Sequence, residues 1–432
     1  MSEGTACLGL YGLRKRLDFE MISFQKRSYT EIHILETEMS KIFNTIKTAI
    51  KDTDFLLMFL CLAASAYGIL AVYSATLAEK DADAALSRDA RTMLIAVGVG
   101  TVMAVIISFI DYNFITKMFP VIGAVCVGLL LLTLVIGVGP AERPDAKTWL
   151  KIGSSGLYFQ PSELMKIGFI ITLGMHIELI GDRLTSFKHV LFLGIHALIP
   201  TGLVAISGDM GSAIVFIIIF AVMAFCAGVQ LRYFVIGGAA VCAAAPAVWY
   251  FVFDSTQKER ILGLFDPDLY SDIMYQQNQG LKALKNGGLT GEGLFHGTLT
   301  QQANAIPEAE NDMIFTAIGE ELGFIGCLLV LCLLVEICIK IVSVGRHSRY
   351  GATSLMCYGM AAMIMGQMTI NVGMCLKILP VIGITLPFFS AGGSSNLCIY
   401  IGIGLIMSIY RFDKEKQATD FRLSNTTVFG NY

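Results

Sequence analysis

The sequence predicts an all-α polytopic membrane protein, a bundle of ten transmembrane helices with a large extracytoplasmic loop between the seventh and eighth. Of the 432 residues, 55% are hydrophobic and only 15% are charged, whereas soluble domains carry roughly 25% charged residues. The apolar residues form continuous runs of the length that crosses about 30 Å of hydrocarbon. Because lipid offers backbone groups no hydrogen-bond partner and barrel strands would alternate in polarity, such runs must be helices.

Ten apolar runs follow one another along the chain. They lie near 55–75, 92–110, 118–138, 162–180, 188–206, 211–228, 233–253, 313–335, 352–374 and 393–410. An even number of spans places both termini on one side of the membrane. The longest connection, 254–311, then lies on the other side, and its aromatic residues and leucines predict that it folds back over the bundle rather than being disordered.

Basic residues gather in both tails, and they decide the predicted orientation. Because cytoplasmic segments carry an excess of Lys and Arg, both termini are expected to be cytoplasmic. The predicted organisation is an N-terminal tail over 1–53, a membrane domain over 54–411 and a C-terminal tail over 412–432. Isoleucines recur every four residues between lysines near 41–51, which indicates a helix lying in the headgroup layer.

Composition excludes several other classes. The formal net charge of -3 shows no basic excess of the kind that nucleic-acid binding requires. The 11 cysteines, all except Cys7, fall in or beside apolar runs without C-x-x-C spacing, so we interpret them as packing residues. His296 has no second ligand at metal-binding spacing, so a structural metal is not expected. The first fifty residues contain no apolar core followed by a cleavage site, and no removable signal peptide is expected.

Ionisable residues inside the spans are the strongest signal of function, since each costs at least ~2.5–3.5 kcal/mol at mid-membrane unless paired or hydrated. Glu163 and Lys166 share one helix face at i,i+3 spacing. They are either a structural ion pair or part of a polar cavity. Glu320 and Glu321 lie two turns into the eighth span, where they require partners or water and are interpreted as polar anchors.

Asp312 stands at the beginning of the eighth span, which the count of spans places at the outer membrane boundary. Its ordinary role would be a helix N-cap. The alternative is a catalytic carboxylate that acts as a general base where the apolar bundle meets the outer water. The residue pattern leaves both open.

A glycine-rich segment over 286–298 could expose backbone N–H groups to a phosphate, with Gly291 and Gly293 at its centre. Glycine runs more often serve turns, and the lysine that a P-loop requires is missing.

Several ordered motifs together resemble a known family, the shape, elongation, division and sporulation proteins (RodA, FtsW and SpoVE). The resemblance runs from about Asp54 to Arg411. The matching segments are Trp149-Leu150, Phe159 to Lys166, Gly208 to Ala213, Arg260-Ile261-Leu262, Asp266-Pro267, Tyr275-Gln276, the glycine-rich segment, Pro307 to Asp312, Gly319 to Gly323, Asn371 to Met374, Leu379 to Gly383 and Pro387 to Ser395.

The resemblance implies a peptidoglycan glycosyltransferase that polymerises lipid II at the outer face of the cytoplasmic membrane. Asp312 corresponds to the family's essential carboxylate. The leaving lipid diphosphate needs cations, for which Lys151, Lys258, Arg260 and Lys282 are candidates, and Trp149 could contact a sugar ring or anchor the interface. The polar residues Asp209, Ser394 and Ser395 are expected beside the cavity. A divalent cation (Mg or Mn) could assist these side chains at the diphosphate, although the sequence does not identify its ligands. No other cofactor is implied.

The resemblance also implies partners, namely a class B penicillin-binding transpeptidase and other proteins of the elongation or division complex. Thr148 stands where the family usually has Arg, although Lys147 could reach the same anion. Gly297-Thr298 favours the elongation branch, while division and sporulation remain open. Two alternatives remain: a lipid II flippase or ion-coupled transporter that uses the buried charges, and a non-catalytic scaffold in which Asp312→Asn would leave function intact.

Overall fold

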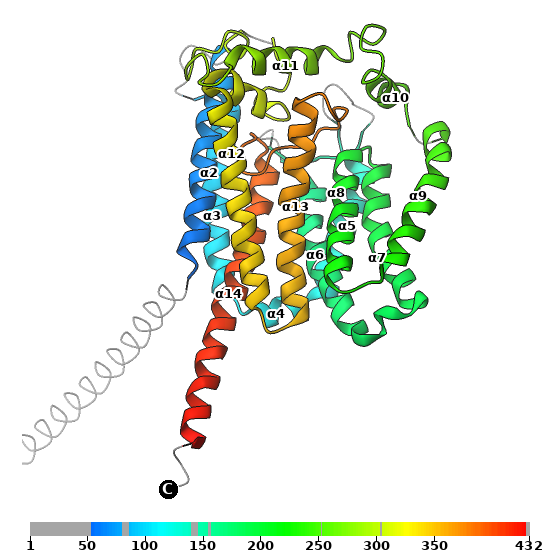
Figure 1. Ribbon diagram of the computed structural model, residues 1–432, viewed down its shortest axis with the longest axis vertical. Helices are drawn as coiled ribbons and strands as arrows, with labels where there is room; N and C mark the ends of the chain where they lie inside the picture. Colours follow the sequence, from blue (N-terminus) through cyan, green and yellow to red (C-terminus); the bar gives the residue numbers. More distant parts are fainter. Residues whose placement is uncertain are drawn as a thin grey trace, which may run out of the picture. The chain divides into compact units, whose positions relative to one another are not determined.

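The computed structural model describes residues 53–79, 86–139, 146–153, 157–251, 253–302 and 305–428 (Figure 1). Contacts divide the chain between Thr53 and Asp54, and the first of the two units lies outside the described residues apart from Thr53. The interfacial helix predicted near 41–51 therefore also lies outside them. The account below concerns the second unit.

The described residues include nine helices that are long and apolar enough to cross a membrane. These are α2 (Phe55–Ala75), α3 (Arg88–Ser108), α5 (Phe119–Ile136), α6 (Pro161–Ile180), α7 (Phe187–Ile206), α9 (Leu231–Phe251), α12 (Ile314–His347), α13 (Gly351–Cys375) and α14 (Gly393–Val428). A shorter apolar helix, α8 (Met210–Cys226), has 17 residues. The class of a polytopic α-helical membrane protein is confirmed, whereas the tenth crossing stays a prediction because α8 is short.

Short elements connect the long helices. They are η1 (Leu77–Glu79), α4 (Tyr112–Lys117), β1 (Leu150–Ile152), β2 (Leu157–Phe159), η2 (Gly181–Thr185), α10 (Ser255–Leu262) and α11 (Tyr275–Gly287). The two strands form an antiparallel hairpin in which Lys151 pairs with Tyr158. Hydropathy did not predict this hairpin, since three-residue strands leave no apolar run.

Local sequence explains where several helices begin. The carboxylates of Asp54, Asp209 and Asp254 and the hydroxyl of Ser87 each accept a backbone N–H from the first turn of α2, α8, α10 and α3. These side chains satisfy N–H groups that have no partner within a helix. Pro161 occupies the first turn of α6, where the missing N–H costs nothing.

The helix α12 is interrupted near its beginning. Gly323 has φ 65° and ψ -163° inside the helix, a conformation that L-residues with a side chain rarely adopt. A Cβ built on Gly323 would lie 2.4 Å from the backbone nitrogen of Gly291. The predicted span 313–335 was too short and contained no break, because a hydropathy average does not register a single glycine.

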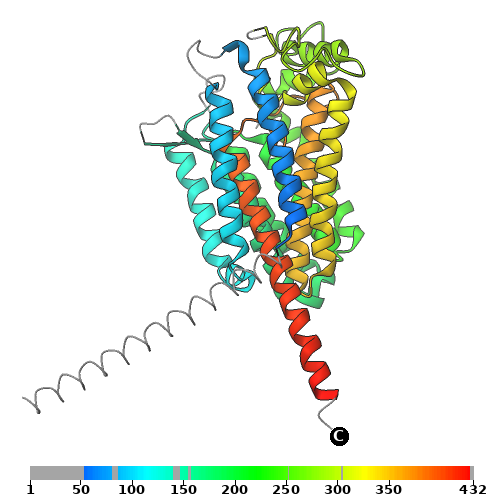
Figure 2. The ribbon, with the colours of Figure 1, turned by 90° about the vertical axis from the view of Figure 1, so that its left-hand side faces the viewer.

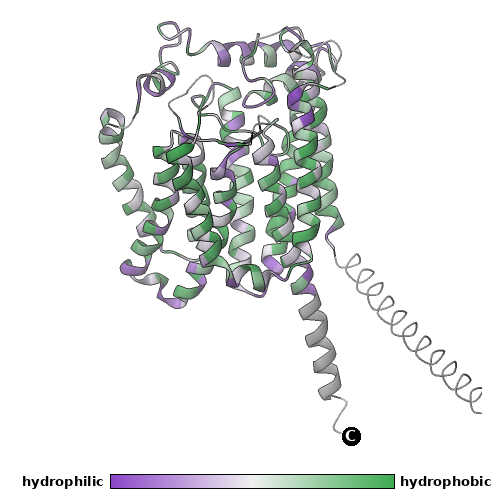
Figure 3. Cartoon of the chain, turned by 180° about the vertical axis from the view of Figure 1, so that it is seen from behind, coloured by the Kyte–Doolittle hydropathy of each residue, from purple (hydrophilic) through white to green (hydrophobic). Residues whose placement is uncertain are grey.

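The helices differ in how far they are buried. In the most apolar window of α13 and of α14, 78% of residues are buried, whereas in α9 none is. Figure 1 shows α9 at the edge of the bundle, away from α12 and α13. Figure 3 shows apolar residues along the helices and polar residues gathered at the connections at their ends, as expected for helices in lipid.

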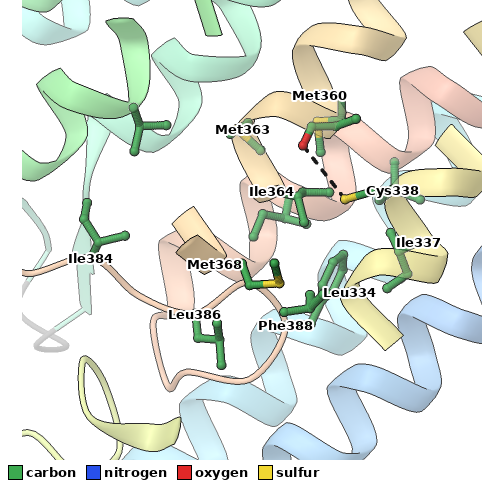
Figure 4. Close-up of a cluster of buried hydrophobic side chains, with 14 of the residues drawn as sticks. Leu334, Ile337, Cys338, Met360, Met363, Ile364, Met368, Ile384, Leu386 and Phe388 are labelled. Carbon is green, nitrogen blue, oxygen red and sulfur yellow. Dashed lines mark hydrogen bonds between the residues drawn. The ribbon is translucent and has the colours of Figure 1, made fainter. Parts of the chain in front are cut away.

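The core extends into the connection between α13 and α14. Figure 4 shows Leu386 and Phe388 of this connection among side chains of α12 and α13, including Leu334 and Ile364. Figure 2 shows α12 and α13 in a view turned by 90° from that of Figure 1. All ten cysteines in the described ranges are free thiols; seven are buried, as packing residues should be, whereas Cys226, Cys242 and Cys332 are exposed. The buried connection fixes the backbone that borders the candidate site.

The segment between α9 and α12 is folded onto the bundle, as predicted. In α11, the Gln277 amide donates to the carbonyls of Met374 and Leu379 at 2.8 Å each. A Cβ on Gly280 would lie 2.5 Å from the methyl carbon of Met313, so α11 packs closely against the beginning of α12. The side of the membrane on which this segment lies stays a prediction.

Candidate active site

A polar cavity of about 280 Å³ lies where several connections meet. It is bordered by the residues just before β1, the beginnings of α6 and α8, the segment before α12 and the connection before α14. The polar and charged lining residues are Thr148, Trp149, Gln160, Asp209, Arg260, Gln276, Glu308, Asn311, Asp312, Thr385 and Ser395. Five predicted site residues are thus brought together from distant parts of the sequence: Trp149, Asp209, Arg260, Asp312 and Ser395.

Asp312 lines this cavity from the segment immediately before α12. The helix itself has Met313 as its N-cap, without a capping side-chain bond, so Asp312 stands one residue before the N-cap position. The Asp312 carbonyl accepts a hydrogen bond from the Asn371 amide at 2.9 Å, and the same amide donates to the Ile384 carbonyl at 2.8 Å. Asn371 therefore ties the backbone of the carboxylate to the connection before α14.

Asp312 is half-buried, and a glycine, Gly383, lies beside its carboxylate. Gly383 has φ 74°, and a Cβ built there would lie 3.6 Å from Asp312 Oδ2. The backbone of Gly383 therefore lies close to the carboxylate without a side chain between them.

Asp209, in contrast, has its oxygens engaged by neighbouring donors. Oδ1 accepts the Ser212 N–H at 2.9 Å, while Oδ2 accepts the Gln160 amide at 2.8 Å and the Ser162 hydroxyl at 3.1 Å. These bonds join the beginnings of α6 and α8. The arrangement supports a positioning role for Asp209 rather than proton transfer.

Of the four predicted cations, Arg260 lines the cavity. Its guanidinium donates to the Val381 carbonyl at 2.9 Å, which holds it against the connection before α14. Lys151, Lys258 and Lys282 do not border the cavity in the described structure. Lys147, the suggested substitute for the family arginine, donates instead to the Leu134 carbonyl at 3.0 Å.

Ser394 and Ser395 begin α14 at the cavity. Ser395 lies 3.2 Å from the Thr385 hydroxyl. The Ser394 hydroxyl accepts the Gln160 N–H at 3.1 Å and donates to the Tyr158 carbonyl at 3.3 Å. The two serines thereby connect α14 with the hairpin and the beginning of α6.

Glu163 and Lys166 form a direct ion pair in α6, 2.6 Å from Oε1 to Nζ, and their side chains are 7% and 0% exposed. Neither borders the Asp312 cavity. The contact favours the structural interpretation of this pair over the cavity interpretation.

The carboxylates of Glu320 and Glu321 join the beginning of α12 to α2, to Asn286 and to residues 299–301. The fully buried Glu320 carboxylate accepts the N–H groups of Leu299 and Thr300, the Thr300 hydroxyl and the Asn286 amide, at 2.7–3.1 Å. Glu321 accepts the Ser74 hydroxyl at 2.6 Å and the Gln301 amide at 2.9 Å. Both acids thus have the polar partners that the sequence required of them, and their role as polar anchors of the bundle interior stays a prediction.

Gly291 and Gly293 do not present their N–H groups to a ligand. Gly291 donates to the Gly287 carbonyl at 2.7 Å, and Gly293 donates to the Glu321 carbonyl at 2.9 Å. Gly291 also has φ 81°, and a Cβ there would lie 2.1 Å from the Glu321 carbonyl oxygen. The geometry does not support the substrate-binding role predicted for these glycines; it shows close backbone packing.

Gly291→Ala is expected to loosen the glycine-rich segment, because the new methyl group would collide with the Glu321 backbone. Limited proteolysis should show faster cleavage within 286–298 than in the unsubstituted protein. Gly288→Ala is the matched control: its φ is 50°, but a Cβ there meets nothing within 4 Å. Equal cleavage of both variants would show that backbone strain alone, rather than the contact, is responsible.

Other lining residues were missed as site residues. Gln160, Gln276 and Glu308 lie within the motifs that carried the family resemblance, and this signal could have identified them. Thr385 lies in an apolar stretch that carries no such signal. Among the described residues, no three His, Cys, Asp or Glu side chains are close enough to hold a metal ion together.

The fold and the cavity define a polytopic α-helical membrane protein with an acidic site at the helix ends. The family model described as "Cell cycle protein" (FtsW/RodA/SpoVE) matches residues 55–415. The chain therefore belongs to the FtsW/RodA/SpoVE family.

Two curated relatives are similar to this chain over most of its length. The chain is 30% identical over 322 residues to the peptidoglycan glycosyltransferase MrdB of Escherichia coli (strain K12), covering 74% of this chain and 84% of the relative. It is also 30% identical over 369 residues to the stage V sporulation protein E of Bacillus subtilis (strain 168), covering 84% and 98%.

Solved structures show the same fold. A chain from a structure described as structural coordination of polymerization and crosslinking by a peptidoglycan synthase complex matches with a TM-score of 0.70 and 26% identity, covering 84% of this chain and 98% of that chain. The rod shape determining protein RodA of Thermus thermophilus matches with a TM-score of 0.61 and 23% identity, covering 83% and 97%.

Proposed function

We propose that this protein is a peptidoglycan glycosyltransferase that joins lipid II units into glycan strands. The observation that carries the proposal is the cavity that holds Asp312 beside Arg260 and Trp149, together with relatives named as peptidoglycan glycosyltransferases. A half-buried carboxylate and a cation on one polar wall suit a displacement in which a proton is removed and an anion leaves.

In the proposed reaction, Asp312 takes the proton from the acceptor sugar hydroxyl as that oxygen attacks the anomeric carbon of the donor. The new glycosidic C–O bond forms while the bond from the anomeric carbon to the diphosphate breaks, and the bonding electrons leave with the lipid diphosphate. The proton passes from Asp312 to water after release. A positioned general base typically contributes ~10²–10⁴-fold to such a step.

Arg260 is the residue proposed to stabilise the negative charge on the departing diphosphate. Preorganised cations lower a barrier most when they are fixed before charge develops, and the bond to Val381 fixes this guanidinium. A divalent cation could add to this stabilisation through the substrate's own diphosphate oxygens.

The proposal places the cavity at the outer face of the cytoplasmic membrane, with both termini in the cytoplasm. It also includes a class B penicillin-binding transpeptidase that cross-links the product. The structural relative from a peptidoglycan synthase complex supports such a partner. We assign the protein to the elongation branch on Gly297-Thr298 alone, since the relatives at 30% identity include both MrdB and the stage V sporulation protein E.

The test is glycan-strand formation by purified protein from lipid II, in detergent and without an ion gradient, with and without a cognate class B transpeptidase. Polymer in either condition is expected. If no polymer forms in either condition while lipid II crosses vesicle membranes containing the protein, the transferase proposal is wrong and the flippase alternative replaces it.

Asn371→Leu is expected to lower polymerisation, because it leaves the Asp312 and Ile384 carbonyls without the amide that joins them. We expect kcat to fall with little change in KM, since the backbone of the proposed base shifts while substrate contacts remain. The loss of hydrogen bonds to buried carbonyls also costs about 1–3 kcal/mol of stability.

Gln367→Leu is the matched control for this prediction. Gln367 is a buried amide one turn earlier in α13, and its Oε1 has no partner in the described structure. A similar fall in kcat for both variants would show that Asn371 acts through general packing and not through Asp312.

A further inference from the structure

A second cavity, of about 1090 Å³, lies between α8, α12 and α13 toward the His347 end of α12. The candidate active site lies at the opposite end of this helix, and the two cavities share no lining residue. Its volume is slightly above the ~300–1,000 Å³ typical of small-molecule sites. The space is therefore large enough for a long ligand.

The wall of this cavity is almost entirely apolar. Its floor is made of the small buried residues Cys338, Ala361 and Ala362. The Cys338 thiol donates to the Ala361 carbonyl at 3.9 Å, and Figure 4 shows Cys338 beside Ile337 and Met360. At the rim, Cys226 is exposed and Ile339 is 58% exposed. Because these spans face lipid, the open side of the groove faces hydrocarbon, which suits an alkyl chain.

One end of the groove is polar and cationic. Arg346 and His347 line it at the C-terminal end of α12, beside Ser343 and Tyr358. The carboxyl end of a helix also favours cations at this position. Both side chains are exposed, so they can reach an anion at the membrane surface.

A smaller cavity of about 300 Å³ adjoins this polar end and shares Ser343 and His347 with the groove. It adds Lys414 to the cationic group, and Lys340, which already pairs with Asp54 at 3.1 Å. Its one acid, Asp413, already accepts hydrogen bonds from the Tyr112 hydroxyl at 2.7 Å and the Ser348 hydroxyl at 2.6 Å. With the Lys340–Asp54 pair counted as neutral, Arg346 and Lys414 outnumber Asp413, so the local charge at this end is positive, next to an apolar groove.

We propose that this groove binds an anionic glycerophospholipid. An acyl chain lies along Val222, Val335 and Ile339, and the headgroup phosphate contacts Arg346. The proposal rests on charge complementarity together with an apolar channel, since basic pockets between transmembrane helices bind anionic headgroups. It does not depend on the proposed glycosyltransferase activity.

The test is a titration of the full-length protein with phosphatidylglycerol, followed by native mass spectrometry in a zwitterionic detergent. Arg346→Gln should weaken binding about tenfold, the effect of losing one charge-assisted hydrogen bond. Cys226→Trp should weaken binding as well, because the indole fills the groove from its rim; Ala362→Leu fills it from the floor. Phosphatidylcholine should bind more weakly than phosphatidylglycerol.

Lys188→Gln is the control, since it removes one exposed positive charge from the beginning of α7, outside the groove. It should leave the affinity unchanged. Unchanged binding to Arg346→Gln, or equal binding of the two lipids, would overturn the proposal. Competition by free glycerol phosphate, or full binding to both groove-filling variants, would show that the site takes a soluble anion and not a lipid.

Discussion

Asp312→Asn is expected to reduce glycan-strand formation by about 10²–10⁴-fold, the usual contribution of a general base. The amide keeps the size of the side chain but cannot take the proton from the acceptor hydroxyl. The backbone contacts of Asp312 with Asn371 are unaffected, because they use the main-chain carbonyl. Polymer length and rate from lipid II, measured by gel separation of the products, check the result.

Asp272→Asn is the matched control for this substitution. Asp272 is an exposed carboxylate in the same segment between α9 and α12, and it does not line the cavity. It should polymerise at the normal rate. If folded Asp312→Asn also polymerises normally, Asp312 is not the base and the scaffold or transporter alternatives gain weight.

Lys166→Met is expected to destabilise the protein by about 3–5 kcal/mol, because it leaves the buried Glu163 carboxylate without its partner. The two groups are 2.6 Å apart, and the lysine side chain is fully buried. An unpaired buried charge costs far more than a lost surface contact. Unfolding in mixed detergent micelles measures the change in free energy.

The double variant Glu163→Leu with Lys166→Met should recover most of this loss, since a buried ion pair replaced by apolar side chains is often close to neutral. Lys188→Met, at an exposed position, should change stability by less than about 0.5 kcal/mol. Failure of the double variant to recover would mean that the pair also organises other parts of the bundle. A double variant that folds but does not polymerise would support the cavity interpretation of this pair.

The sequence alone predicted the class of fold, because long apolar runs permit few structures in lipid. It also predicted most boundaries of the membrane helices within a few residues, since the apolar runs end close to where the helices end. The family motifs indicated Asp312 without any geometry. They did so because the order of residue types along the chain is itself the signal.

Only the tertiary structure decided which predicted residues meet. Arg260 reaches the cavity while Lys151, Lys258 and Lys282 do not border it, and their sequence positions do not distinguish them. Gly291 packs against Glu321 rather than presenting its N–H to a phosphate. Hydropathy and capping depend on neighbours along the chain, whereas the cavity is formed by segments up to about 250 residues apart that converge through long-range packing. That convergence is a property of the folded chain, which is why the site had to be read from the structure.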